Sequence, residues 1–291
     1  LQQCILRNNI RKLREWGVKN TVSAVFTPIE VFYARWKMDR YIRALMQADA
    51  VITPSNYCKT HMLRFVPNKY VSELRDKILV IPYIIPDNLE LIPHETSDRF
   101  FTLLYMGGSD VSKGCFNLLN AMIVCHKYRP NVRLFMTNIY KDTIISQFIK
   151  KYKLENNVFL LPRLNHSQLS KLIKEVDVVI SPSLWPETFL QVAIEANLMG
   201  RAVIVPQIGA PTGYIIEGVN GFFVDSFDVG SLARKIIEIS DLPTEVITQM
   251  GLRARELALK NFNNRIIINS YIDLYKLLIH NAQQQHVRKT L

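Results

Sequence analysis

The sequence predicts an α/β protein built on a parallel, doubly wound sheet. Short runs of β-branched and other apolar residues alternate with longer stretches of helical periodicity, an order typical of βαβ units. The chain has 291 residues, of which 48% are hydrophobic, enough for two compact domains with separate cores. We predict strands at residues 21–26, 50–53, 78–82, 102–106, 132–137, 158–161, 176–181, 202–205 and 222–224.

A polar stretch rich in proline divides the chain. The segment 82–100 combines prolines with a polar cluster between two periodic regions, which places a domain boundary near residue 95. We therefore predict a first domain over residues 1–95 and a second over 96–262. The segment 263–291 is assigned to a helix at 265–280 and a tail. The crevice between two such domains is the expected ligand site.

Composition argues against several classes of protein. The sequence has no run of about 18 apolar residues and no apolar signal peptide, so we expect neither a membrane-spanning helix nor secretion, but a cytosolic chain. Four cysteines, Cys4, Cys58, Cys115 and Cys125, form no C-x-x-C pair. Neither a zinc site nor a disulfide framework is therefore predicted, and buried or half-buried thiols are expected.

The net charge of +11 is concentrated near the N-terminus. Residues 1–70 carry 12 Lys and Arg against 4 acidic residues, and the segment 1–16 has the pattern of a basic amphipathic helix. Three roles are open for this helix: a solvated outer face, contact with an anionic membrane surface that carries lipid-linked acceptors, or contact with nucleic acid. Because the sequence shows no aromatic-rich basic motif, nucleic acid is not expected as a partner.

Two glutamates at a strand-to-helix junction are the main candidates for a site. The strand at 176–181 runs into the segment 182–186, whose two prolines end it, and a helix is predicted to begin near Thr188. Free N–H groups at a helix N-terminus favour phosphate oxygens. Glu187 lies at this junction, and Glu195 lies two turns into the predicted helix, where it can accept hydrogen bonds from ribose hydroxyls. The alternative is an ordinary acidic first turn without a ligand.

The order of motifs around this pair resembles the C-terminal half of the family 4 glycosyltransferases, which have the GT-B fold. The shared pattern comprises a glycine loop with a K-G helix start, a P-S dipeptide, an E-x7-E element followed by Ala, a further glycine, a buried strand and a G-x-N-G turn. These elements correspond here to Gly107, Gly108, Lys113, Gly114, Pro182, Ser183, Glu187, Glu195, Ala196, Gly200, 202–205 and 218–221. The resemblance covers about residues 20–280 and implies two Rossmann-like domains that face a cleft, with the final helix returning to the N-terminal domain.

The resemblance also implies a shortened N-terminal domain. The family usually has several more strands, and a glycine-rich loop facing the acceptor and the sugar, before the strand matched at 21–26. The chain begins at Leu1, so a fragment, a natural minimal form and one half of an assembly are all open. A His that relatives often carry after this strand is absent from the segment 27–30, and Ser109 stands where many carry an Arg.

Roles for the candidate residues follow from the resemblance. Lys113, together with the backbone N–H groups of Gly107 and Gly108, is expected to contact the donor diphosphate. Glu195 is expected to hold the ribose and Glu187 to orient the donor sugar, so Lys113 and Glu187 are the catalytic candidates. The backbone groups of Thr188, Phe189, Leu190 and Gln191 are expected to complete the donor site. Arg163 is expected to lie beside the base.

Plainer interpretations stay open beside these roles. Lys113 can be a solvated lysine ahead of a glycine, and Arg163 an ordinary exposed arginine. Trp185 can stack on a sugar or simply cover the edge of the cleft. No metal and no other cofactor is implied by the resemblance, because the cation, the N–H groups and the helix start are expected to neutralise the diphosphate.

The implied reaction is transfer of a sugar from a nucleotide diphosphate sugar to a glycan, lipid-linked or other acceptor, with retention at the anomeric carbon. The alternative is a noncatalytic or half-enzyme GT-B subunit that binds nucleotide and needs a partner chain. The single sequence does not specify the sugar, the base or the acceptor.

Overall fold

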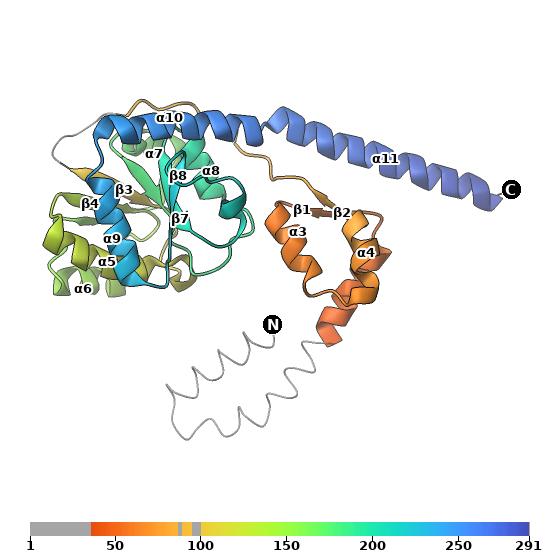
Figure 1. The fold of residues 1–291 in the computed structure, drawn as a ribbon, viewed down its shortest axis with the longest axis horizontal. Coiled ribbons are helices and arrows are strands. Elements are labelled where there is room, and N and C mark those ends of the chain that lie inside the picture. Colours follow the sequence, from red (N-terminus) through yellow and green to blue (C-terminus); the bar gives the residue numbers. More distant parts are fainter. Residues whose placement is uncertain (1–35, 87–88, 95–99, 291) are drawn as a thin grey trace, which may run out of the picture. The chain divides into compact units, whose positions relative to one another are not determined.

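The computed structural model describes residues 36–86, 89–94 and 100–290 (Figure 1). The predicted helix at 1–16, the predicted strand at 21–26 and the segment 27–30 lie outside the described residues. Contacts divide the chain into two units. Of the described residues, the first unit contains 36–52 and 62–79, and the second contains 53–61 and those from 80 onward.

The N-terminal elements run from residue 36 to residue 80. They comprise a helix at 36–47, β1 (Val51–Thr53), α3 (Asn56–Leu63), α4 (Asn68–Lys77) and β2 (Ile78–Val80). Strands β1 and β2 pair with each other, close to where strands were predicted. The first unit has its own small apolar core, made by Ile42, Val51, Val66, Leu74 and Ile78.

The second unit is built on a six-stranded parallel sheet with the order β5-β4-β3-β6-β7-β8. The central strand β3 is buried along its whole length, as expected of an apolar run covered on both faces. Its Leu103 pairs with Leu134 on one side and with Val178 on the other. The strands are β3 (Phe101–Tyr105), β4 (Val132–Met136), β5 (Val158–Leu160), β6 (Val178–Ile180), β7 (Ala202–Pro206) and β8 (Gly221–Val224).

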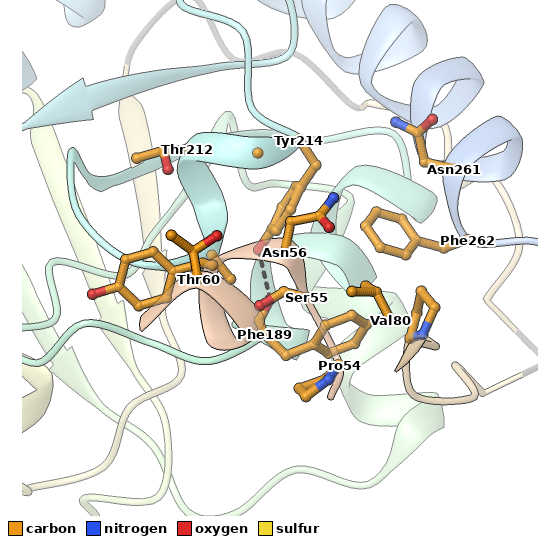
Figure 2. Close-up of a pocket in the computed structure, with 14 residues that line it drawn as sticks. Pro54, Ser55, Asn56, Thr60, Val80, Phe189, Thr212, Tyr214, Asn261 and Phe262 are labelled. Carbon is orange, nitrogen blue, oxygen red and sulfur yellow. Dashed lines mark hydrogen bonds between the residues drawn. The ribbon is translucent and has the colours of Figure 1, made fainter. Parts of the chain in front are cut away.

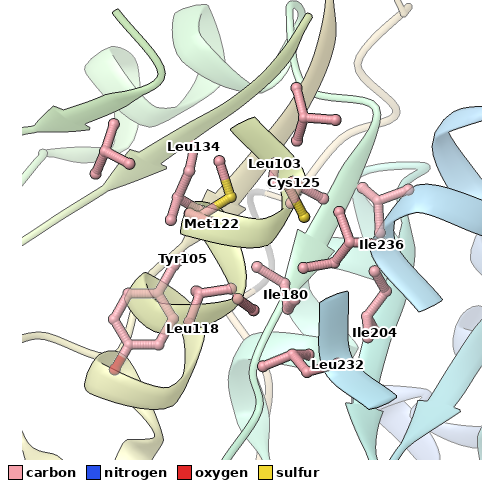
Figure 3. Close-up of a cluster of buried hydrophobic side chains, with 14 of the residues drawn as sticks. Leu103, Tyr105, Leu118, Met122, Cys125, Leu134, Ile180, Ile204, Leu232 and Ile236 are labelled. Carbon is pink, nitrogen blue, oxygen red and sulfur yellow. The ribbon is translucent and has the colours of Figure 1, made fainter. Parts of the chain in front are cut away.

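Helices cover both faces of this sheet (Figure 1). The larger apolar core lies on the face covered by α5, α6 and α9, and Figure 3 shows Leu118, Met122 and Ile236 packed against strand residues there. The second core lies under α7, α8 and part of α10. The helices are α5 (Cys115–Tyr128), α6 (Thr143–Lys151), α7 (His166–Ile173), α8 (Gln191–Leu198), α9 (Val229–Ser240), α10 (Thr244–Asn261) and α11 (Asn264–Thr290).

The strand order reverses direction between β3 and β6. The chain moves outward from β3 through β4 to β5 and then returns to the other side of β3. In open parallel sheets, ligands bind outside the carboxyl ends of the strands at such a switch point. The loops that follow β3 and β6 are therefore where the topology places a site, and both carry residues singled out from the sequence.

The stretch that leads into the sheet is fixed to the second unit by polar side chains. Arg201 is 2% exposed, and its guanidinium donates to the carbonyls of Ile92 (2.9 Å) and Ile173 (2.7 Å). Asn264 accepts a hydrogen bond from the N–H of Ile85 at 2.9 Å. The stretch from residue 80 thus belongs to the second unit by its contacts, while the functional division near residue 95 stays a prediction.

Two helix boundaries differ from the sequence expectation. α8 begins at Gln191 rather than near Thr188, because Leu190 adopts a left-handed conformation (φ 52°, ψ 64°) that no α-helix continues. Glu195 consequently lies one turn into α8 instead of two. α11 continues to Thr290, ten residues beyond the predicted end at 280. Among the described residues, no helix combines the length and the apolar character needed to cross a membrane.

The described cysteines match the expectation of buried or half-buried free thiols. Cys115 and Cys125 are buried in α5, and Cys58 is half-buried. Burial raises the pKa of Cys115 to about 11 and that of Cys125 to about 12, so neither is a reactive thiolate at neutral pH. Cys4 lies outside the described residues.

Candidate functional site

The loop after β3 supplies the first half of the site. Gly108 has φ 66°, and Asp110 caps the short 3₁₀ turn at Val111–Lys113 by accepting the N–H of Ser112 at 2.8 Å. The turn ends at Gly114, which has φ 77°. A Cβ at this position would lie 1.9 Å from the carbonyl oxygen of Pro182. Gly114 is thus needed for the close approach between the loops after β3 and β6.

An ion pair joins these two loops. The Nζ atom of Lys113 lies 2.7 Å from Oε1 of Glu187, 74 residues further along the chain. The Glu187 side chain is 12% exposed and the Lys113 side chain 38% exposed, so the carboxylate lies inside the junction and the ammonium group reaches its surface. The two residues predicted to be catalytic are therefore in direct contact.

Ser183 fixes the geometry around this pair. Its side chain is completely buried, and its hydroxyl donates to Oε1 of Glu187 at 2.8 Å. The Ser183 hydroxyl oxygen also accepts the N–H of Trp185 at 3.2 Å and lies 3.2 Å from the carbonyl oxygen of Ser112. Sequence reasoning used Ser183 only as part of a P-S dipeptide and gave it no role. Trp185 itself is 62% exposed.

Another glycine, Gly209, which the sequence interpretation missed, lies against the backbone of Glu187. Gly209 has φ 84°, and a Cβ there would lie 2.7 Å from both the N and the O of Glu187. The next residue, Ala210, donates its N–H to the Glu187 carbonyl at 2.8 Å. The only signal in the sequence was an I-G-A-P turn, which by itself does not show what it approaches.

The turn into α8 is held in its left-handed conformation by a tyrosine. The Tyr214 hydroxyl donates to the carbonyl of Phe189 at 2.8 Å and lies 3.3 Å from that of Leu190. Burial raises the pKa of Tyr214, so the hydroxyl keeps its proton. A left-handed non-glycine residue costs about 1–2 kcal/mol, which these contacts and the burial of Leu190 offset. Thr188, Phe189 and Leu190 thus form a fixed turn, and the helix N–H groups start at Gln191.

Glu195 lies on α8 and is half-buried. Its Oε1 accepts a hydrogen bond from Nε2 of Gln191 at 2.8 Å. Burial raises the pKa of this carboxyl, and the Gln191 hydrogen bond and the nearby His166 oppose the rise. The arrangement presents a carboxylate with one oxygen anchored and with remaining acceptor capacity for a ligand.

The base-binding candidate lies further out. Arg163 follows β5, two strands from the switch point, and is exposed. It makes no hydrogen bond or ion pair with other described residues. Nearer the switch point, Asn138 has φ 62°, and its side-chain nitrogen would lie 3.5 Å from a Cβ on Gly108. Gly108 is therefore close to the loop after β4, whereas Arg163 forms no hydrogen bond or ion pair with Lys113 or Glu187.

A pocket of about 450 Å³ adjoins the site within the second unit (Figure 2). Phe189 and Ala210, which flank the backbone of the ion-pair junction, form part of its wall. Phe262 packs edge-on against both Phe189 and Tyr214, with ring centroids 5.7 and 5.3 Å apart. In the described part of the chain, no group of three or more His, Cys, Asp or Glu side chains is arranged to hold a metal ion.

Comparison with known proteins decides the family. The sequence profile described as Glycosyl transferases group 1 matches residues 90–257, more than half of the chain. The chain belongs to this family. The matched region contains the sheet, the ion pair and Glu195, so the group 1 match covers the candidate site.

The chain is also similar to individual proteins and solved structures. An uncharacterized 41.2 kDa protein in the cps region of Klebsiella pneumoniae is 30% identical over 184 residues, 63% of this chain and 48% of that protein. The chain thus spans about half the length of this curated relative. A crystal structure of a glycosyltransferase from Rickettsia africae is similar with a TM-score of 0.70 at 23% identity, covering 84% of this chain and 67% of that one.

HepE from Anabaena, solved with UDP and glucose, is similar with a TM-score of 0.65 at 22% identity. This likeness covers 79% of the present chain and 63% of the HepE chain. The prediction of an α/β fold with a parallel sheet, similar to glycosyltransferases of the GT-B fold, is confirmed. The roles of the individual site residues stay predictions.

Proposed function

We propose that this group 1 glycosyltransferase takes a sugar from a nucleotide diphosphate donor and transfers it, with retention at the anomeric carbon, to a glycan, lipid-linked or other acceptor. The observation that supports the proposal is the contact of Lys113 with Glu187 at the switch point of the sheet. A cation and a carboxylate held together in a half-buried junction suit a ligand that carries both a diphosphate and sugar hydroxyls.

In the proposed site, Lys113 and the backbone N–H groups of Gly107 and Gly108 contact the diphosphate. The N–H groups at the start of α8 add positive potential, since the first helical N–H groups have no partner within the helix. Glu195 accepts hydrogen bonds from the ribose, and Glu187 orients the donor sugar through its hydroxyls. Arg163 is proposed only as an outer contact near the base, because it lies two strands from the ion pair.

In the proposed reaction, side chains bind the donor and stabilise charge, and none of them forms a bond with the sugar. The bond between the anomeric carbon and the diphosphate oxygen breaks, and the negative charge that develops on the diphosphate is stabilised by Lys113 and the N–H groups. The acceptor hydroxyl then bonds to the anomeric carbon on the same face, and its proton passes to the diphosphate. No metal or other cofactor is part of this proposal.

Contact with the inner face of a membrane through the basic N-terminal region stays a prediction, because the segment 1–16 lies outside the described residues. The same holds for cytoplasmic location and for a partner chain that would complete the N-terminal side. These proposals rest on the sequence alone.

The test is calorimetric titration of the chain with UDP, GDP and ADP and their common sugar conjugates. Lys113→Met and Glu195→Gln should each weaken nucleotide binding about tenfold or more, since each removes a charged hydrogen bond worth about 1.5–3 kcal/mol. Lys150→Met and Glu155→Gln, both exposed and outside the site, serve as matched controls.

Saturable binding of one nucleotide, weakened in both site variants and in neither control, would support the donor site and identify its base. Binding without sugar transfer to any acceptor would favour the alternative of a half-enzyme subunit. A folded chain that binds none of the nucleotides would overturn the proposal.

A further inference from the structure

The pocket beside the ion pair has aromatic walls and no charge. Figure 2 shows the ring of Phe262 beside Tyr214 and Asn261 at one side of the pocket. None of the described residues that line it is Lys, Arg, His, Asp or Glu. A phosphate or carboxylate would find no counter-charge on this wall, because Lys113, the cation proposed for the diphosphate, is not among the lining residues.

Three hydroxyl groups of the wall already have hydrogen-bond partners. Ser55 donates to the carbonyl of Thr188 at 2.8 Å, and Thr212 donates to that of Gly209 at 2.9 Å. The Tyr214 hydroxyl donates to Phe189, as described above. These bonds fix the turn before α8 and the turn that presses on Glu187. They rigidify the pocket and leave it without these donors for a ligand.

Two amides and two hydroxyls are left for a ligand. Four polar side chains that line the pocket form no hydrogen bond with other described residues: Asn56, Tyr57 and Thr60, from α3, and Asn261, the last residue of α10. An amide both donates and accepts, which matches the hydroxyls of a sugar. An alkyl chain would bury these amides without partners, at a cost in free energy.

We propose that this pocket binds an uncharged sugar ring of the acceptor, with the ring against the aromatic wall and its hydroxyls on Asn56 and Asn261. The pocket volume is within the range of small-molecule sites, which are mostly apolar with a few polar groups that fix orientation. Ala210 belongs to its wall and donates to the backbone of Glu187, so an acceptor sugar here lies next to the proposed donor sugar. The role as an acceptor site rests on the proposed function.

The test uses the full chain saturated with UDP and saturation-transfer NMR. The probes are the methyl glycosides of glucose, galactose, mannose and N-acetylglucosamine, with glucose 1-phosphate as the charged probe and 1-octanol as the apolar one. We expect at least one methyl glycoside to bind. Asn56→Ala and Asn261→Ala should each raise its dissociation constant about fivefold, and the double variant should raise it further. Asn269→Ala, exposed on α11, is the matched control.

Each outcome bears on the inference. Preference for glucose 1-phosphate, equal binding of 1-octanol with no effect of the amide substitutions, or no binding of any methyl glycoside at millimolar concentration would overturn it. Both asparagines are exposed, so the variants should fold and bind UDP as the wild type does. If UDP fails to bind but a methyl glycoside binds through the two asparagines, the sugar pocket stands and the proposed glycosyl transfer fails.

Discussion

Lys113 and Glu187 are joined by a contact of 2.7 Å across the switch point of the sheet. The contact links the two loops between which the strand order reverses, and Ser183 holds the carboxylate from the buried side. The cation proposed for the diphosphate is thus neutralised by the carboxylate proposed for the sugar. A donor that binds here has to draw Lys113 away from Glu187 or share it, so the two residues should contribute to binding with opposite signs.

Glu187→Gln should therefore strengthen binding of a nucleoside diphosphate while it abolishes sugar transfer. Removing the carboxylate frees the ammonium group of a partly exposed pair, and such pairs contribute about 0.2–1 kcal/mol, so the gain in affinity should reach at most about fivefold. Calorimetry with UDP or GDP measures the gain, and a transfer assay measures the loss. Weaker binding of the bare diphosphate in Glu187→Gln would contradict the idea that the two groups compete.

The glycine at the end of the loop after β3 should be irreplaceable. Gly114→Ala combines a left-handed backbone with overlap against Pro182, and we expect a loss of about 3 kcal/mol or more in the free energy of unfolding. Gly218→Ala has positive φ but open space, and should lose about 1–2 kcal/mol. Gly213→Ala has neither, and should change stability by less than about 0.5 kcal/mol.

Urea unfolding of the three variants separates strain from overlap. Equal losses in Gly114→Ala and Gly218→Ala would mean that the approach of the loop to Pro182 contributes nothing, and that the two loops are not packed as tightly as described.

The Glu195 carboxylate, which is proposed to bind the ribose, should lower the free energy of unfolding at neutral pH. Burial raises its folded-state pKa above the unfolded value, so its contribution is favourable at low pH and is lost as the pH rises through the folded-state pKa. Glu195→Gln should thus be more stable than the wild type at pH 7. The difference should shrink as the pH falls towards the ordinary Glu pKa of about 4.3.

Thermal unfolding of both proteins between pH 4 and pH 8 measures this difference, and Glu155→Gln gives the response of an exposed carboxyl. A pH-independent difference would show that the gain comes from packing and not from the charge.

Local patterns allowed the sheet to be predicted well. Every predicted strand from 50 onward has a counterpart, because buried parallel strands are apolar along their whole length and are bounded by turn residues. The contact of Lys113 with Glu187 was not predicted as such, since it depends on the return of the chain to β6 beside β3. The predicted start of α8 was wrong, because Leu190 adopts a left-handed conformation that hydrogen bonds from Tyr214 stabilise. No local sequence pattern encodes this contact.

Arg201 is a structurally important residue that sequence reasoning missed, and its substitution should strongly destabilise the fold. Its guanidinium is buried and donates to several backbone carbonyls, among them those of Ile92 and Ile173, and burial lowers its pKa to about 10. Arg201→Met leaves these carbonyls without donors, and we expect a loss of about 3 kcal/mol or more in the free energy of unfolding. Arg201→Lys should recover only part of it, because one ammonium group cannot reach carbonyls on both sides.

Urea unfolding measures both variants, with Arg253→Met, exposed on α10, as the control. Hydrogen exchange adds a local test: the N–H of Ile92, which bonds to the carbonyl of Met199 at 3.3 Å, should lose protection in Arg201→Met. Full protection at Ile92 in a destabilised variant would show that Arg201 supports only the turn between α8 and β7. Loss of protection there would instead identify it as the residue that fixes the stretch before the sheet.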